Sequence, residues 1–202
     1  MKKIAGMLGL CLLLFSACKK QAHSPVESID TNNSALIPFT HYIIREGQQF
    51  CDQNSFAAVE YAELKFVVKF DSSAIYTTAN HSNQYDINKL YGFSDNDSIH
   101  QRYSARMGWR WSDNALRIFA YVYNTGVRSS KELGTIKIGT ENNCWVKVTG
   151  KHYIFSLNNK TDTLLRSSTT FKARGYKLYP YFGGDETAPH DINILIKELK
   201  GD

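Results

Sequence analysis

Apolar and polar side chains alternate along residues 103–123, which read Y-S-A-R-M-G-W-R-W-S-D-N-A-L-R-I-F-A-Y-V-Y. Successive side chains of a β-strand point to opposite faces of a sheet, so this period of two predicts two strands joined by a turn at residues 112–114. One predicted face is apolar and includes Met107, Trp109 and Ile118. The opposite face carries serine, arginine and aromatic side chains, namely Ser104, Arg106, Arg110, Arg117, Phe119, Tyr121 and Tyr123.

Similar alternation recurs along the chain, and the segments between are rich in Gly, Asn, Asp and Ser, as turns are. Further strands are predicted at residues 64–70, 136–138, 145–149, 153–157, 168–173, 176–182 and 192–197. A weak helical turn is expected at residues 55–63. Many short strands without alternating helices predict an all-β protein, an antiparallel β-sandwich of jelly-roll type.

The N-terminal residues predict export. Lys2 and Lys3 precede an apolar stretch at residues 4–15, which is too short to span a bilayer and ends in F-S-A followed by Cys18. This arrangement resembles the lipobox of bacterial lipoproteins. The resemblance implies a signal peptide at residues 1–17 and a lipid on Cys18 that anchors the exported protein to a bacterial membrane, on the periplasmic side or at the cell surface. The alternative, an ordinary secretory signal, also implies export.

Residues 18–38 are polar and lack apolar periodicity, so we expect a flexible tether. Residues 39–202 suffice for one domain with a sizeable core, which we expect to be a monomer. The formal net charge is +5, and loss of the two signal-peptide lysines leaves 22 basic against 19 acidic residues. This weak positive charge is compatible with an acidic glycan as partner and gives no argument for a nucleic acid.

Cys51 and Cys144 would remain in the exported domain. In an oxidising compartment they could form a disulfide and stabilise the fold by roughly 2–4 kcal/mol, provided that the fold brings their Cα atoms close enough. The six histidines show neither H-x-H nor H-x-x-x-H spacing, and no Cys-x-x-Cys occurs. We therefore predict no metal site and no cofactor, and leave the disulfide open.

Three short motifs follow one another in the chain: Lys89 within N-K-L-Y-G, Ser104-x-Arg106, and Tyr121-x-Tyr123. In this order they resemble the alginate and glucuronan lyases with a β-jelly-roll fold, over roughly residues 60–198. The resemblance implies catalytic roles for all five of these residues. The Lys89 segment departs from the family pattern because it lacks a Pro-Gly insert and a second glycine.

The residue types suit β-elimination on a uronate, in which negative charge develops toward the carboxyl group. Arg106 can bind a carboxylate in bidentate fashion, and Lys89 can add a point charge. A tyrosine of the Tyr121–Tyr123 pair can act as base if neighbouring cations lower its pKa. Candidate substrate-binding residues are Arg110, Arg117, Phe119, Tyr181 and His190, the last also a second candidate base.

Three functions remain open at this level. The first is a lipid-anchored lyase acting on an anionic polysaccharide. The second is a surface lipoprotein of the same fold that binds glycan without cleaving it, with aromatic rings stacked on sugars. The third is a scaffold protein whose arginines and tyrosines are solvated, paired across the sheet or part of an ordinary strand face. Convergence of Lys89, Arg106 and the tyrosine pair in one groove would favour the first.

Overall fold

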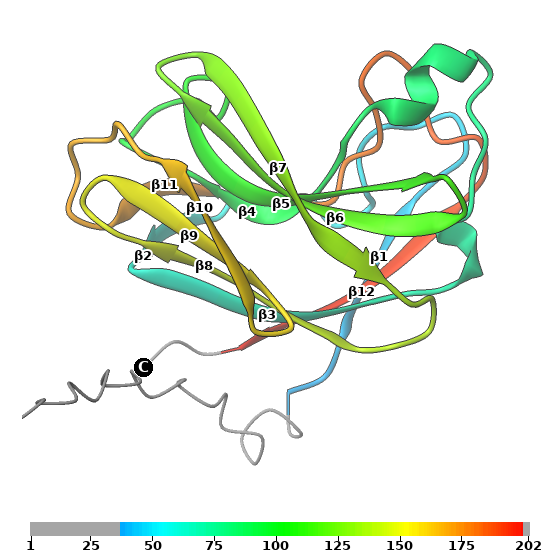
Figure 1. Cartoon of the computed structure of the whole chain (residues 1–202), viewed down its shortest axis with the longest axis horizontal. Coiled ribbons are helices and arrows are strands. Elements are labelled where there is room, and N and C mark those ends of the chain that lie inside the picture. The colour runs from blue at the N-terminus through cyan, green and yellow to red at the C-terminus, as the bar shows by residue number, and fades with distance from the viewer. Residues whose placement is uncertain (1–36, 200–202) are drawn as a thin grey trace, which may run out of the picture. The chain divides into compact units, whose positions relative to one another are not determined.

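The computed structural model describes residues 37–199. The predicted signal peptide at residues 1–17, the predicted lipidation site Cys18 and nearly all of the predicted tether lie outside the described residues. Within residues 37–199, no helix is long and apolar enough to cross a membrane. Two antiparallel six-stranded sheets make up the domain (Figure 1). The predicted antiparallel β-sandwich is thus confirmed.

The first sheet has the strand order β1-β12-β3-β8-β9-β10. Its strands are β1 (Thr40–Ile44), β12 (Ile192–Leu199), β3 (Glu63–Phe70), β8 (Asn142–Val148), β9 (His152–Leu157) and β10 (Lys160–Leu165). The second sheet has the order β2-β11-β4-β5-β6-β7. Its strands are β2 (Ala58–Tyr61), β11 (Ala173–Leu178), β4 (Asn88–Ser94), β5 (Tyr103–Ser112), β6 (Ala115–Asn124) and β7 (Val127–Ile136). Two short 3-10 helices, η1 (Ser72–Ala74) and η2 (His81–Tyr85), lie between β3 and β4.

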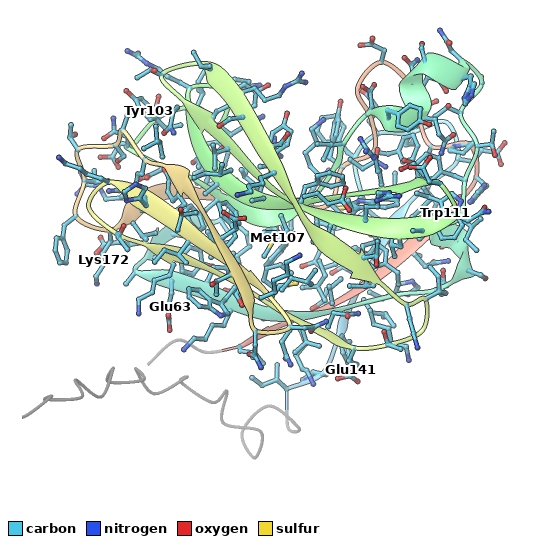
Figure 2. The ribbon with its side chains drawn as sticks, viewed as in Figure 1. Glu63, Tyr103, Met107, Trp111, Glu141 and Lys172 are labelled. Atoms are coloured by element: carbon cyan, nitrogen blue, oxygen red, sulfur yellow. The ribbon has the colours of Figure 1, made fainter. Side chains whose placement is uncertain are left out.

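The core fills the space between the two sheets. Met107 lies at the middle of β5 (Figure 2), and its side chain is fully buried in this core. Trp109 packs against Phe70 of the other sheet, with ring centroids 5.2 Å apart, and against Tyr76 at 5.8 Å. The apolar face predicted for residues 103–123 therefore points inward, and the face with arginines and tyrosines points away from the core.

Tight two-residue turns explain why the hairpins of the chain form in register. Asp113 and Asn114 both have positive φ, 52° and 54°, and they join β5 to β6 with Ser112 opposite Ala115. Asn and Asp tolerate this left-handed conformation, which matches the twist of the flanking strands. The β9–β10 connection uses the same device at Asn158 and Asn159. The predicted turn at residues 112–114 is confirmed.

A β-bulge in β4 sets the position of Lys89. The register with β5 shifts between Lys89 and Tyr91, so that Leu90 and Tyr91 are both buried in the core. Lys89 lies opposite Gly108, on the outward face, and Gly92 lies opposite Arg106. A bulge places two successive side chains against one residue of the partner strand. The unusual K-L-Y-G-F sequence thus still directs Lys89 and Arg106 to the same face.

Four local predictions were wrong in whole or in part. Of the strand predicted at residues 136–138, only Ile136 lies in a strand, as the last residue of β7. Residues 55–63 form no helical turn, because β2 and the start of β3 occupy most of this stretch as paired strands. Residues 168–173 form a strand only from Ala173 onward, since their hydroxyl groups serve a buried ion pair instead of a sheet. The segment at 176–182 leaves its strand at Leu178, shortly before Pro180, which has no N–H to donate.

That buried ion pair joins Asp95 to Arg166, whose side chains are 0% and 1% exposed. Arg166 Nε donates to Asp95 Oδ2 at 2.8 Å, and the Tyr153 hydroxyl donates to the same oxygen at 2.6 Å. Burial alone would raise the pKa of Asp95, but the hydrogen bonds from Arg166 and Tyr153 hold it below its usual value. Ser168 and Thr170 complete the network with their hydroxyl groups.

The disulfide left open by the sequence does not form. Cys51 and Cys144 are free, buried thiols. Cys51 pairs with Ile44 at the end of β1, whereas Cys144 lies on β8, and β12 and β3 run between these two strands. Cys51 lies on the side of β1 away from β12, so four inter-strand spacings of about 4.8 Å each separate it from Cys144. The resulting separation of about 19 Å is well beyond the reach of a disulfide.

Candidate functional site

A cleft of about 690 Å³ opens on the outward face of the second sheet. Its floor comes from β4, β5 and β6, because the side chains that alternate with the core residues of these strands point into it. One wall is the segment from Tyr176 to Tyr181, and a loop between β1 and β2 lies beyond it. The lining residues that matter below are Phe50, Phe56, Lys89, His100, Arg106, Tyr121, Tyr123, Arg128, Tyr176 and Tyr181.

Lys89, Arg106 and Tyr121 meet on the floor of the cleft. Lys89 Nζ lies 5.5 Å from the centroid of the Tyr121 ring, and the Arg106 guanidinium carbon lies 5.5 Å from the same centroid. Tyr121 is directly opposite Arg106 in the β5–β6 ladder, and its ring is 5.8 Å from that of Tyr123. Four of the five residues predicted to be catalytic therefore line one cleft.

Arg106 is buried, with 7% of its surface exposed, and none of the described residues provides a carboxylate partner. Its Nε is fully buried and has no hydrogen-bond acceptor within residues 37–199. Burial lowers the pKa of Arg106 to about 10, although the surrounding tyrosines oppose this shift. The cleft thus contains a desolvated positive charge that the described chain does not neutralise.

The absence of a side chain at Gly92 makes room for this arginine. A Cβ atom at Gly92 would lie 2.3 Å from Arg106 Cβ and 2.3 Å from the Ala105 carbonyl oxygen. Both distances are far below van der Waals contact. The glycine in K-L-Y-G-F is therefore a packing requirement of Arg106.

Lys89 is held by the main chain. Its ammonium donates a 2.6 Å hydrogen bond to the Gly183 carbonyl, and it also lies 5.7 Å from the Tyr181 ring centroid. Burial lowers the pKa of Lys89 to about 8, and the nearby charge of Arg106 adds to this effect. An amine of this kind is available in its neutral form near physiological pH.

Tyr121 behaves differently from the prediction. Burial raises the pKa of Tyr121 to about 12, with a further contribution from Tyr123, and the charge of Arg106 offsets this only in part. The expectation that neighbouring cations would lower the pKa of Tyr121 is therefore wrong, because desolvation of the phenolate is the larger effect. Tyr121 keeps its proton at neutral pH.

Ser104 is on the same strand as Arg106 but does not line the cleft. It is fully buried opposite Tyr123, and its hydroxyl has no partner among the described residues. The family-implied role of Ser104 places it next to the substrate. In the structure its side chain is buried and is not part of the cleft lining, so contact with a ligand in the cleft would require rearrangement.

The predicted substrate-binding residues divide into three groups. Tyr181 lines the cleft. Arg110 and Phe119 lie on the same outward face beside the cleft, with the guanidinium 4.8 Å from the Phe119 ring centroid and hydrogen-bonded to the Tyr85 carbonyl. Arg117 forms ion pairs with two carboxylates, at 3.2 and 3.0 Å, and does not reach the cleft.

His190 also lies outside the cleft. Its Nε2 is 2.8 Å from the Ser73 carbonyl oxygen at η1. Another histidine, His100, lines the cleft instead. The Tyr176 hydroxyl accepts from the His100 backbone N–H at 3.0 Å and is 2.9 Å from Nδ1. Burial lowers the pKa of His100 to about 4, so this imidazole is neutral.

Several cleft residues were not found by sequence reasoning. Arg128 is the second residue of the exposed strand β7 and lies opposite Tyr123, where the sequence shows no apolar alternation. Phe50 and Phe56 come from a loop, and His100 from a turn before β5. None of these positions carries a periodic signal, since loops are placed by long-range contacts.

No Asp or Glu is among the residues that line the cleft. A smaller hollow adjoins it and shares Lys89, Tyr121 and Arg128, and there Asp86 is the one carboxylate of the lining. Within residues 37–199 no group of three or more His, Cys, Asp or Glu side chains is arranged to hold a metal ion. The chemistry of the cleft is that of cations and phenols.

No model of a protein family matches the sequence, and a search of curated proteins finds no match. Solved structures match the fold. The alginate lyase AlyC3 has a TM-score of 0.56 over 80% of this chain and 74% of its own, at 9% identity. A glycoside hydrolase family 16 endo-glucanase from Bacteroides ovatus has a TM-score of 0.54, covering 81% of each chain, at 13% identity.

AlyC3 in complex with dimannuronate gives a TM-score of 0.52, over 81% of this chain and 76% of the lyase, at 8% identity. At such low identities the likeness concerns the fold alone. The chain has the concanavalin-like jelly-roll fold that alginate lyases share with family 16 glycanases.

Proposed function

We propose that the protein is an exported, lipid-anchored lyase that cleaves an anionic, uronate-containing polysaccharide by β-elimination. One observation carries the proposal: the buried guanidinium of Arg106 has no carboxylate partner within residues 37–199 and opens onto a cleft that also contains Lys89 and Arg128. A third cation of the lining, Lys177, is paired with Glu198. A buried charge is costly unless it is paired. The carboxylate of a uronate matches Arg106 in charge and in bidentate geometry.

The proposed reaction removes the proton from C5 of the uronate. The electrons of that C–H bond form the C4=C5 double bond, and the C4–O bond breaks toward the glycosidic oxygen, which takes up a proton. Negative charge develops on the carboxyl group in the transition state. Arg106, fixed and desolvated beneath it, stabilises that charge.

Lys89 is the proposed base and Tyr121 the proposed acid. With a pKa of about 8, the Lys89 amine can accept the C5 proton near neutral pH, which an ordinary lysine does poorly. With a pKa of about 12, Tyr121 holds the proton that the leaving oxygen needs. Because Lys89 and Arg106 flank the same Tyr121 ring, the three groups can reach neighbouring atoms of one sugar.

Hydrolysis of a neutral glycan fits the site less well. Glycoside hydrolases of the common type use two carboxyl groups on opposite sides of the scissile bond. The described residues that line the cleft include no carboxylate, and the adjoining hollow contributes Asp86 alone. Although the fold is similar to that of family 16 glycanases, the lining of the cleft does not supply the pair of carboxyl groups that such hydrolysis needs.

The test uses the full-length chain, purified in detergent, with alginate and glucuronan as substrates. We expect an increase in ultraviolet absorbance from the unsaturated product. The variant Lys89→Arg keeps the positive charge but cannot act as base, so we expect it to retain the polymer without releasing product. Absence of product from every polyuronate with the wild-type chain would exclude the lyase.

A glycan-binding protein that does not cleave is the second candidate. It is favoured by the 2.6 Å hydrogen bond from Lys89 to the Gly183 carbonyl, which holds the amine against the wall of the cleft. Retention of a polyuronate in an affinity gel, without product, would support this alternative. Loss of that retention in Arg106→Met would assign the binding to the same cleft.

A further inference from the structure

Two phenylalanines are exposed at the edge of the cleft. Phe50 is 63% and Phe56 is 79% exposed, and both lie in the loop between β1 and β2. Single exposed apolar residues are common on protein surfaces. These two differ because both line the same cleft as the uncompensated cations.

Both rings are held in place by tyrosines of the opposite segment. The Phe50 ring contacts Tyr181 edge-on, with centroids 4.9 Å apart and planes at 80°, and the two residues also form a backbone bridge. The Phe56 ring lies 5.8 Å from that of Tyr176 at 36°. The next residue, Ala57, accepts a 2.9 Å hydrogen bond from the Lys177 backbone N–H. Rings fixed before a ligand arrives lose little entropy on binding.

The two tyrosines that contact Phe50 and Phe56 belong to one extended segment, which runs along the cleft. Residues 176–181 run antiparallel to β4, with Leu178 opposite Gly92 and Tyr181 opposite Lys89. An extended segment of this length separates Tyr176 from Tyr181 by about 15 Å. The two phenylalanines therefore stand at different points along the cleft, further apart than the width of one sugar ring.

We propose that Phe50 and Phe56 are stacking platforms for separate sugar units of one anionic polysaccharide chain. The inference rests on the proposed function and extends it from a uronate unit to a polymer several units long. Sugar rings present an apolar face of C–H groups that packs on an aromatic ring, while their carboxylates reach the cations. Arg106, Lys89 and Arg128 supply that charge, and the lining of the cleft has no acidic residue to repel the chain.

The test measures the dissociation constants of alginate oligomers of two, four and six units, with the full-length chain in a Lys89→Arg background that blocks turnover. We expect affinity to rise with oligomer length. The double variant Phe50→Ala/Phe56→Ala should lose this gain, by about two- to twelve-fold for each ring, and keep its affinity for the dimer. A Phe50→Leu/Phe56→Leu variant keeps apolar bulk without a ring face and should show the same loss.

Phe171 provides the matched control, because it is 94% exposed and does not line the cleft. Phe171→Ala should leave every affinity unchanged. Unchanged hexamer affinity in the double variants would overturn the inference while leaving the proposed function intact. If the parent protein is dimeric in solution and the double variants are monomeric, the two rings contact a second copy of the protein, and the inference is overturned. If the parent binds no uronate oligomer of any length, the proposed function fails and the inference fails with it.

Discussion

Two arginines in this domain are almost completely buried, and they differ in what surrounds them. Arg166 is paired with Asp95, whereas Arg106 has tyrosine rings for neighbours and no carboxylate within the described part of the chain. The first is a structural ion pair. The second imposes a desolvation cost on the free protein that a bound anion would relieve.

Because of this contrast, replacing the two arginines should change the free energy of unfolding in different ways. Arg106→Met removes an unpaired buried charge, so the free energy of unfolding should stay unchanged or rise by about 1–3 kcal/mol, while polyuronate binding is lost. Arg166→Met strands the carboxylate of Asp95 and should lower the free energy of unfolding by about 3–5 kcal/mol. Urea denaturation of both variants measures this. Equal destabilisation by the two changes would contradict the assignment of Arg106 to ligand binding.

The proposed base gives a pH dependence. Burial lowers the pKa of Lys89 to about 8, and a base acts only after losing its proton, so kcat/KM should rise with pH up to about 8 and then level off. Arg106 stays charged over this range because its pKa is about 10, so binding should persist. Initial rates from pH 6 to 9 test this, and a rate that falls over the same range would argue for protonated Lys89 as the active form.

At the scale of elements, the β4 bulge and the glycine that follows it position the two cations. Gly92→Ala would press a methyl group against Arg106 and the Ala105 carbonyl. We expect a loss of about 1–3 kcal/mol in the free energy of unfolding, with weaker polyuronate binding, because the strand must shift to relieve the clash.

Gly150→Ala is the matched control for this change. No atom lies within 4 Å of a Cβ built at Gly150, and its φ is not positive, so alanine should be tolerated. Thermal unfolding of both variants, followed by circular dichroism, separates the two cases. If the two alanine variants are equally stable, β4 accommodates the methyl group and Gly92 is not needed to make room for Arg106.

The elements that the sequence predicted well are those with one buried face. The β5–β6 hairpin alternates apolar and polar residues and ends in an Asp-Asn turn, so its faces, register and turn follow from the chain itself. The pattern of β7 was missed over most of its length because both its faces are largely exposed. Residues 168–172 resemble a strand for another reason: the hydroxyl groups of Ser168 and Thr170 bind the buried carboxylate of Asp95.

The same distinction holds for the candidate site. Lys89, Arg106, Tyr121 and Tyr123 alternate with core residues, so their common face could be predicted from the sequence. Phe50 and Phe56 could not be predicted, because a loop takes its position from contacts with residues more than a hundred positions away. The raised pKa of Tyr121 could not be predicted either, because it depends on burial by neighbouring strands and by the residues that line the cleft.

At the scale of the whole molecule, the sandwich places Cys51 beside the end of β1 and Cys144 on β8, with β12 and β3 between these two strands. Both thiols are therefore expected to remain free even in an oxidising compartment. Alkylation under denaturing conditions without reductant, followed by mass spectrometry, should modify Cys51 and Cys144. The midpoint of thermal unfolding should be the same with and without dithiothreitol, and a lower midpoint in reductant would indicate a disulfide.

The wall of the cleft at Tyr181 is held in place by single backbone bridges between distant parts of the chain. Phe50 and Lys89 each bridge to Tyr181, and neither contact belongs to a continuous ladder. Contacts between residues so far apart in sequence are entropically costly and form slowly, so these bridges should form late in folding and open early in unfolding. Amide hydrogens at the cleft wall should therefore exchange with solvent faster than those in the β5–β6 hairpin, and a ligand bound across the wall should slow that exchange first.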